Sequence, residues 1–146
     1  MTIFTGQATT SASPAQAWRA LIDITDWPRW TPSYKSIERL DDGPVAVGSR
    51  ARVRQPRLAP AIYEVVEIDQ GKTFTWTSTA AGVRTVARHR LVPQPDGGTR
   101  IELAAEFTGW LAGPVKAFLG RRIQRYVSLE ANGIKAAAEA ARDHVA

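Results

Sequence analysis

Two titratable residues, His89 and Glu64, are the strongest candidates for acid–base chemistry in this chain. His89 lies in a segment of alternating character, and it shares its side with Ala87 and Leu91, the side expected to face the interior. An imidazole titrates near neutral pH and can therefore give or take a proton there. We favour the simpler alternative for His89, a core histidine that hydrogen-bonds to the backbone or to a helix side chain.

Glu64 fits either face of its segment. It is in phase with Ile62 and Val66, which suggests the inner face, where a carboxylate would need a partner. The opposite phase turns Tyr63 inward and leaves Glu64 in solvent, and this alternative is at least as well supported. If both candidates point inward, a pair of His89 and Glu64 could transfer protons in a cyclisation or a dehydration.

A set of aromatic and aliphatic side chains is predicted to line a ligand pocket. Aromatic walls suit flat polycyclic or sterol-like molecules, although any single aromatic residue is more often ordinary core. Arg122, beside the apolar stripe of the last predicted helix, either reaches an anionic group at the pocket mouth or extends to water. The predicted ligand-binding residues, besides Arg122, are Trp30, Tyr34, Val53, Phe74, Trp76, Ala87, His89, Leu103, Phe107, Trp110, Phe118 and Tyr126.

Several kinds of chemistry find no support in the sequence. There is no cysteine, and the two histidines, His89 and His144, are too few for a transition-metal site. No glycine-rich nucleotide motif occurs, and neither Ser128 nor Thr108 has a visible base that would make it a nucleophile. We therefore expect neither a metal nor a cofactor.

The net charge of +5 is spread over separate segments, such as the alternating Arg50, Arg52 and Arg54. This pattern is typical of the solvated face of a strand, and no recognition motif accompanies it, so no nucleic-acid partner is expected. No signal peptide and no run of roughly 20 apolar residues is visible. We expect a cytoplasmic protein without stable membrane insertion, and the sequence indicates no oligomeric state.

Turn residues and periodicity divide the chain into a strand, two short helices, six strands and one long helix. Ser13, Pro14 and Gln16 form a helix start with a capping box, and Asp26 is expected to cap a second short helix that ends before Pro32. Strands are predicted over residues 2–10, 34–41, 48–55, 61–69, 72–79, 83–92 and 99–108, and the long helix over 111–142.

This order predicts one α+β domain over residues 1–146, in which a curved antiparallel sheet of seven strands wraps the long C-terminal helix. That helix would be about 45 Å long, enough to cross the sheet, and its apolar stripe includes Phe118. A strongly twisted sheet curls around a single helix, and small inward residues such as Ala51, Ala87 and Ala105 leave room between them. A cavity between helix and sheet is therefore predicted.

Five local features accompany this order of elements. They are Ser-Pro-Ala-Gln-Ala-Trp at 13–18, Trp-Pro-Arg-Trp-Thr-Pro at 27–32, Val-Gly-Ser-Arg at 47–50, His89 before Leu91, and Gly-Gly-Thr-Arg-Ile at 97–101. With them the chain resembles, over nearly its whole length, the polyketide cyclase/dehydrase and lipid-transport branch of the START-like, helix-grip superfamily. The resemblance implies a helix-grip fold with an apolar ligand cavity. It implies no particular reaction, because the superfamily contains binders, carriers and enzymes.

Three functions are compatible with these observations. The first, which we favour, is the binding of a hydrophobic small molecule, such as a lipid, a polyketide or an aromatic compound, in an internal cavity. The second is a polyketide cyclase, aromatase or dehydratase that uses an inward histidine or glutamate. The third is an interaction module that uses the basic surface.

Overall fold

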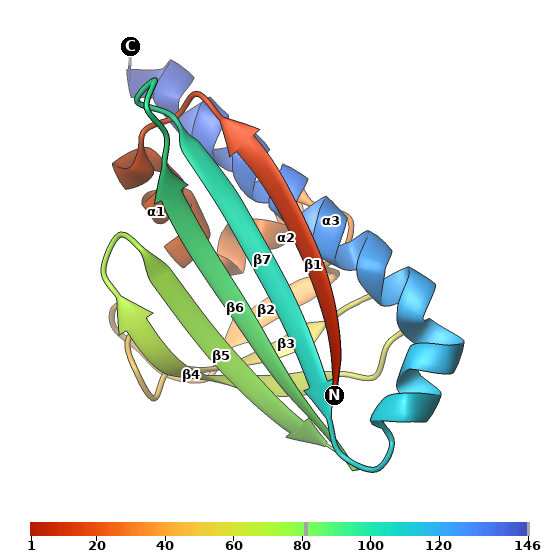
Figure 1. The fold of residues 1–146 in the computed structure, drawn as a ribbon. Helices are drawn as coiled ribbons and strands as arrows, with labels where there is room; N and C mark the ends of the chain where they lie inside the picture. Colours follow the sequence, from red (N-terminus) through yellow and green to blue (C-terminus); the bar gives the residue numbers. More distant parts are fainter. Residues whose placement is uncertain (81, 146) are drawn as a thin grey trace.

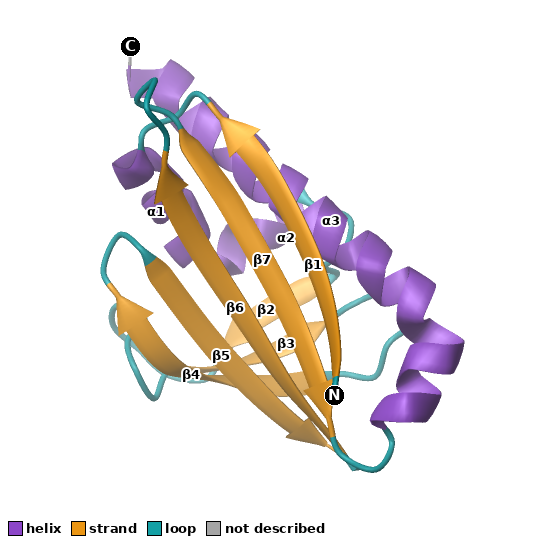
Figure 2. Cartoon of the chain, in the orientation of Figure 1, coloured by secondary structure: helices purple, strands orange, loops and turns teal. Residues whose placement is uncertain are grey.

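The seven strands and the long helix form the predicted α+β architecture (Figures 1 and 2). The structure is a computed structural model that describes residues 1–80 and 82–145, with side chains described as far as residue 141. The side chain of His144 therefore lies outside the described residues. The elements are β1 (Thr2–Thr10), α1 (Pro14–Ile22), the 3₁₀ turn η1 (Ile24–Asp26), α2 (Trp27–Trp30), β2 (Ser36–Arg39), β3 (Arg50–Arg54), β4 (Ala61–Asp69), β5 (Thr73–Ala80), β6 (Val83–Pro93), β7 (Thr99–Thr108) and α3 (Ala112–Val145).

The strands form one antiparallel sheet in the order β1-β7-β6-β5-β4-β3-β2. From β2 to β7 each strand pairs with the next one along the chain, which is the pattern that short turns produce. β1 pairs with β7, which is distant from it in the sequence, and β1 also packs against α3. The sheet curves strongly, and α3 runs along β1 and β7 while α1 and α2 close one end (Figure 1). One face of the sheet is thereby covered, and this covered face carries the core.

The predicted helix cap is present at the start of α1 but not at the start of α2. The Ser13 hydroxyl accepts a hydrogen bond from the Gln16 backbone, and the Gln16 side chain accepts one from the Ser13 backbone, which confirms the capping box. Asp26 precedes α2 as predicted, but its side chain does not cap the backbone. Its carboxylate instead accepts from Trp30 Nε1 at 3.2 Å and from the Arg29 guanidinium. Because α2 is a single turn, these side-chain donors compete successfully with its backbone amides.

An aromatic cluster fills the closed end of the sheet. Trp27 of α2 lies with its ring centroid 5.4 to 6.2 Å from those of Tyr34, Phe74, Trp76 and His89. The Trp27 indole nitrogen donates to the Leu21 carbonyl at 3.1 Å, so its polar atom is satisfied inside the core. Aromatic rings therefore occupy this end of the interior, and a cavity lies farther along α3.

Gly133 permits the close approach of α3 to the segment after α2. A Cβ placed there would lie 2.7 Å from Thr31 Cβ and 3.0 Å from the Trp30 carbonyl oxygen. The absence of a side chain at this position therefore serves close packing against Thr31, not against the sheet.

A Gly133→Ala variant is expected to unfold at a lower temperature than the wild type. Alanine would add about 1 kcal/mol of helix propensity, but crowding in a well-packed site costs about 1 to 3 kcal/mol. Gly113→Ala is the matched control, since a Cβ at this position of the same helix meets nothing within 4 Å. Thermal melts that rank Gly133→Ala at or above Gly113→Ala would contradict the packing argument.

Candidate functional site

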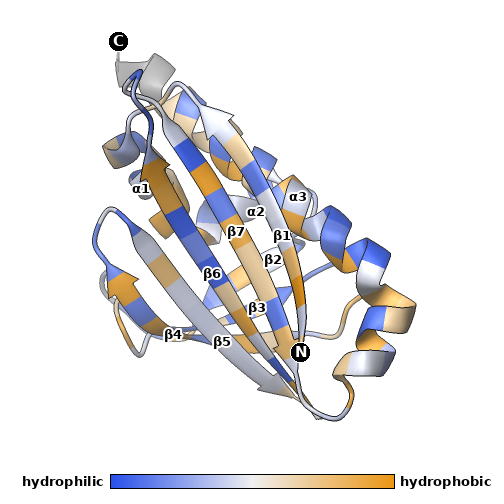
Figure 3. Ribbon diagram, viewed as in Figure 1, coloured by the Kyte–Doolittle hydropathy of each residue, from blue (hydrophilic) through white to orange (hydrophobic). Residues whose placement is uncertain are grey.

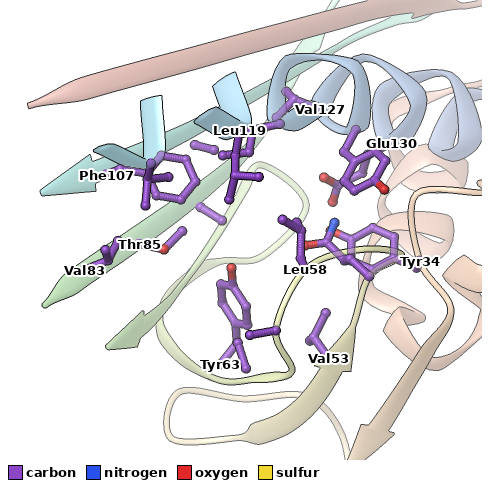
Figure 4. A pocket seen from close by; sticks show the side chains of 18 of the residues that line it. Tyr34, Val53, Leu58, Tyr63, Val83, Thr85, Phe107, Leu119, Val127 and Glu130 are labelled. Atoms are coloured by element: carbon purple, nitrogen blue, oxygen red, sulfur yellow. The ribbon is translucent and has the colours of Figure 1, made fainter. Parts of the chain in front are cut away.

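A cavity of about 240 Å³ lies between the curved sheet and α3 (Figure 4). Its walls come from β3 to β7, from α3 and from the connection between β3 and β4. Small side chains face it from the middle of the sheet, where Ala87 of β6 pairs directly with Ala105 of β7. Most of its lining is apolar, and the residues are Tyr34, Val53, Gln55, Leu58, Ala59, Ala61, Tyr63, Trp76, Val83, Thr85, Ala87, Ala105, Phe107, Val115, Leu119, Ile123, Tyr126, Val127 and Glu130.

Six of the predicted ligand-binding residues line this cavity. They come from β3, β5, β6, β7 and α3 and from the segment before β2, so the fold brings together positions spread over most of the chain. The strand members follow the predicted alternation, with Val53 buried between the exposed Arg54 and the half-buried Arg52. The six are Tyr34, Val53, Trp76, Ala87, Phe107 and Tyr126.

Three predicted residues, Phe74, His89 and Leu103, point inward but do not reach the cavity. They are buried nearer the closed end of the sheet, where Phe74 stacks on the His89 ring at 4.5 Å. Strand alternation gives a residue its face, but the position along the strand decides whether it meets core or cavity. Trp30 also lies away from this cavity, because its indole is held by Asp26 beside α2.

The prediction that Trp110 and Phe118 bind the ligand is wrong, because both side chains are largely exposed to solvent. Trp110 is 79% exposed because β7 ends at Thr108 and the turn carries the indole over Gly82, outside the cavity. Phe118 is 86% exposed. The cavity-facing side of α3 carries Val115 and Leu119 instead, so the apolar stripe is narrower than predicted and excludes Phe118.

Arg122 lies half-buried beside the cavity wall but is not part of it. Its guanidinium donates to the Arg57 carbonyl at 3.2 Å, and one turn later the Tyr126 hydroxyl donates to the Pro56 carbonyl at 2.5 Å. Both bonds tie the β3–β4 connection to α3. They hold Leu58 over the cavity, so the role of Arg122 in this structure is to fix a wall segment.

Glu64, the second candidate for acid–base chemistry, does not face the interior. It is exposed on the outer face, 3.9 Å from the Arg50 guanidinium on the neighbouring strand. Tyr63 takes the inward position and lines the cavity, so the alternative phase is the right one. Ile62 and Val66, whose apolar character suggested that this face is covered, are exposed on the outer face.

The inward carboxylate belongs to Glu130, a buried residue of α3 that the sequence analysis missed. It lies at the end of the cavity nearest the aromatic cluster, and Figure 4 shows its carboxylate next to Tyr34. A signal for it existed in the sequence. Glu130 follows Ile123 and Val127 and precedes Ile134 at spacings of three and four, which places it on the covered side of the helix.

Glu130 forms a buried pair with His89. His89 Nε2 lies 3.1 Å from Glu130 Oε1, and Nδ1 lies 3.0 Å from the Phe74 carbonyl oxygen. A carbonyl only accepts, so Nδ1 carries a proton and donates it. The contact with Glu130 then holds one further proton, which either Nε2 donates to the carboxylate or a protonated Glu130 donates to Nε2. The favoured alternative for His89, a histidine bonded to the backbone and to a helix side chain, matches these contacts.

Two buried tyrosines, Tyr34 and Tyr63, also line the cavity. The pKa of Tyr34 lies well above its ordinary value, because the residue is buried, the charge of Glu130 opposes ionisation, and its hydrogen bond with Glu130 favours the neutral hydroxyl. Burial, with the charge of Glu130, also raises the pKa of Tyr63 to about 12. Both side chains therefore present neutral hydroxyls to the cavity at physiological pH.

A Tyr63→Phe variant is expected to lose less stability at alkaline pH than the wild type. Since the folded pKa of Tyr63 is about 12 and the reference value is 10.0, the unfolded chain releases the phenolic proton first as pH rises. The contribution of Tyr63 is thus full below about pH 10 and falls as pH approaches about 12. Urea denaturation of both proteins at about pH 9 and about pH 11 measures the difference. Equal losses in the two proteins would contradict the assignment.

Comparison with known proteins places these features in a family. The sequence model of the family described as polyketide cyclase/dehydrase and lipid transport matches residues 1–139 of the 146. This chain belongs to that family. No protein with curated annotation matches the sequence. Family membership supports a hydrophobic small molecule as the ligand class and leaves the reaction, if any, to the site itself.

Solved structures similar to this family member share its fold at low sequence identity. A protein of Thermus thermophilus is 16% identical with a TM-score of 0.78, over 96% of this chain and 99% of its own. An aromatase/cyclase of Streptomyces sp. R1128 is 15% identical with a TM-score of 0.79, over 94% of this chain and 93% of its own. A START superfamily protein of Mycobacterium smegmatis is 15% identical with a TM-score of 0.71, over 94% and 97%. These likenesses support the START-like fold.

Two kinds of feature are absent from the described residues. No helix among them is long and apolar enough to cross a membrane. Within the same residues, no group of three or more histidine, aspartate or glutamate side chains is arranged to hold a metal ion.

Proposed function

We propose that this protein binds a small hydrophobic molecule in the cavity between the sheet and α3. The observation that carries the proposal is a mostly apolar cavity of about 240 Å³ with its titratable carboxylate at one end. A dry apolar cavity of about 150 Å³ holds benzene, and pockets for drug-sized ligands start at about 300 Å³. The ligand that fits is therefore one or two fused rings or a short acyl chain, smaller than the polycyclic molecules suggested by the aromatic content.

The polar end adds a requirement on the ligand. Glu130 shares a hydrogen bond with His89 and one with the Tyr34 hydroxyl beside it. Its carboxyl oxygens still have lone pairs free to accept another hydrogen bond. A ligand hydroxyl or amine that reaches this end would donate to Glu130 while its rings fill the apolar part. An apolar ligand that lacks a donor would cover the remaining lone pairs of Glu130 without giving them a partner.

Fluorescence titration with 2-naphthol and 2-methoxynaphthalene tests both parts of this proposal. Each molecule has two fused rings, but only 2-naphthol donates a hydrogen bond. We expect 2-naphthol to bind about ten-fold to a hundred-fold more tightly, since a hydrogen bond to a charged group contributes about 1.5 to 3 kcal/mol. A Glu130→Gln variant should show a smaller difference in affinity between 2-naphthol and 2-methoxynaphthalene. If neither molecule binds the folded protein, the ligand-holding function is wrong.

A second candidate function, proton transfer, is favoured by the single proton held between His89 and Glu130. Glu130 faces the cavity while His89 lies behind it, 2% exposed, so a substrate would exchange its proton with Glu130. His89 would then position Glu130 and balance its charge. Such an enzyme could act in a cyclisation, aromatisation or dehydration, because these reactions share removal of a proton next to a carbonyl.

Hydrogen–deuterium exchange of 2-tetralone in heavy water, followed by NMR, tests the proton-transfer function. This two-ring ketone has acidic protons beside its carbonyl and matches the size of the cavity. The carboxylate of Glu130 would remove one of these protons and return a deuteron from solvent. We expect exchange above the buffer rate with the wild type and none with Glu130→Gln. Exchange that is independent of the protein would exclude this function.

A further inference from the structure

Two large aromatic side chains stand in solvent at the end of the molecule where α3 begins. Trp110 lies in the turn before α3 with its indole over Gly82, and Phe118 lies two turns into the helix. The end of β5, the starts of β1 and β6, the end of β7 and the start of α3 gather at this end (Figure 1). Exposed apolar side chains that gather at one end of a domain, rimmed by polar residues, are typical of an interaction surface.

The charges around these aromatic residues are all positive. From residue 107 to residue 129 the sequence contains no aspartate or glutamate but contains Lys116, Arg121, Arg122 and Arg125. Arg121 and Arg125 follow Phe118 by three and seven positions, so they share its face of the helix. Figure 3 shows hydrophobic and hydrophilic residues side by side on this half of α3. We call Trp110, Phe118, Arg121 and Arg125 the α3-start surface.

Most arginines on the outer face of the sheet are paired, whereas those of the α3-start surface are not. On the outer face of the sheet, five arginines form ion pairs with glutamates of the same or neighbouring strands. Among the described residues, no carboxylate lies within ion-pair distance of the cations near the α3-start surface, which are Arg57, Arg84, Lys116, Arg121 and Arg125. The sheet face is therefore neutralised internally, and the positive field of the protein is concentrated at this end.

We propose that the α3-start surface docks peripherally on a lipid membrane that carries anionic headgroups. Exposed tryptophan and phenylalanine bury in the interface between headgroups and acyl chains, and unpaired arginines are attracted by the anionic lipids around them. Exposed aromatic and basic residues together favour a membrane over a nucleic acid, for which charge alone would suffice. No helix of the described residues spans a membrane, which agrees with docking from one side.

The surface adjoins the cavity. Val115 and Leu119 of α3 line the cavity, and their neighbours Lys116 and Phe118 are exposed on the same turns of the helix. Val83 of β6 also lines the cavity, and it directly follows Gly82, which the Trp110 indole covers. A protein docked in this way would hold its ligand site next to the bilayer, from which an apolar molecule could enter. Docking itself needs no ligand, so the inference goes beyond the proposed function and is tested without one.

Co-sedimentation with lipid vesicles at low salt tests the docking. We expect binding to vesicles that mix phosphatidylcholine with phosphatidylglycerol, little binding to phosphatidylcholine alone, and weaker binding as salt rises. An Arg121→Gln/Arg125→Gln variant should bind the anionic vesicles about thirty-fold more weakly, since each cation near such a surface contributes about 1 kcal/mol. Arg50→Gln/Arg52→Gln is the matched control, because it removes the same charge from the outer sheet face.

Brominated lipids supply a second readout of the aromatic contact. In anionic vesicles they should quench part of the tryptophan fluorescence of the wild type, and a Trp110→Phe variant should lose most of this quenching. Trp110 is exposed, so its replacement is not expected to unfold the protein, and thermal melts check this.

Four results would overturn the proposal. They are no binding to anionic vesicles at low salt, equal weakening by the two double-arginine variants, quenching that survives in Trp110→Phe, and displacement of the protein from vesicles by duplex DNA at low concentration. Failure of 2-naphthol to bind would end the proposed ligand function but would leave the vesicle result standing.

Discussion

A His89→Ala variant is expected to lose about 3 to 5 kcal/mol of unfolding free energy. Removal of the imidazole deprives the buried Glu130 carboxyl group of its histidine partner and removes the side-chain hydrogen bond to the Phe74 carbonyl. It also opens a void under the aromatic ring that stacks on the histidine. Urea denaturation at neutral pH measures the loss, which would be among the largest for any single replacement in this chain.

The double variant His89→Leu/Glu130→Leu distinguishes two contributions to stability. One is the cost of leaving a single buried polar group without its partner, and the other is the net contribution of the pair. Apolar replacement of a whole buried pair is often neutral or stabilising, so the double variant should be more stable than His89→Ala. The single variants His89→Leu and Glu130→Leu complete the cycle, which gives the coupling energy between the two side chains. If His89→Ala costs less than about 1 kcal/mol, the pair is not buried as described and the argument for a held proton is wrong.

An Ala87→Phe variant is expected to weaken binding of 2-naphthol by about ten-fold to a hundred-fold. Ala87 lies in the middle of the cavity wall and pairs with Ala105, so an aromatic ring at this position would fill the space that the ligand needs. Burial of one aromatic ring contributes about 1.5 to 3 kcal/mol, and its exclusion gives a loss of this order. The same fluorescence titration that tests the proposed function measures the loss.

The control for Ala87→Phe is Ala104→Phe. Ala104 is the neighbour of Ala105 in β7 and does not line the cavity, so a ring added there leaves the cavity open. Both variants should melt within a few degrees of the wild type, since the ring introduced by Ala87→Phe would occupy existing space. Unchanged affinity in a folded Ala87→Phe protein would show that the ligand binds elsewhere.

The periodicity of the sequence determined the elements and their order. Alternation over residues 83–92 and 99–108 gave the strands and their inward faces, and the capping box at Ser13 gave the start of α1. Small residues at Ala87 and Ala105 indicated space beneath the helix, and the structure has its cavity there. These predictions succeeded because each depends on the local repeat of a strand or a helix, which the residues of that segment specify by themselves.

The tertiary structure alone decided which side chains meet at the site. Glu64 and Tyr63 sit on opposite faces of β4, and since both faces carry apolar residues, only the packing of the strand shows which one is covered. The extent of the covered stripe on α3 depends likewise on how the helix is rotated against the sheet, and this rotation leaves Phe118 in solvent. The pair of His89 and Glu130 joins residues 41 positions apart, a contact that local periodicity does not specify. The sequence by itself therefore determined the scaffold and the space inside it, and the three-dimensional packing decided the polar group that faces that space.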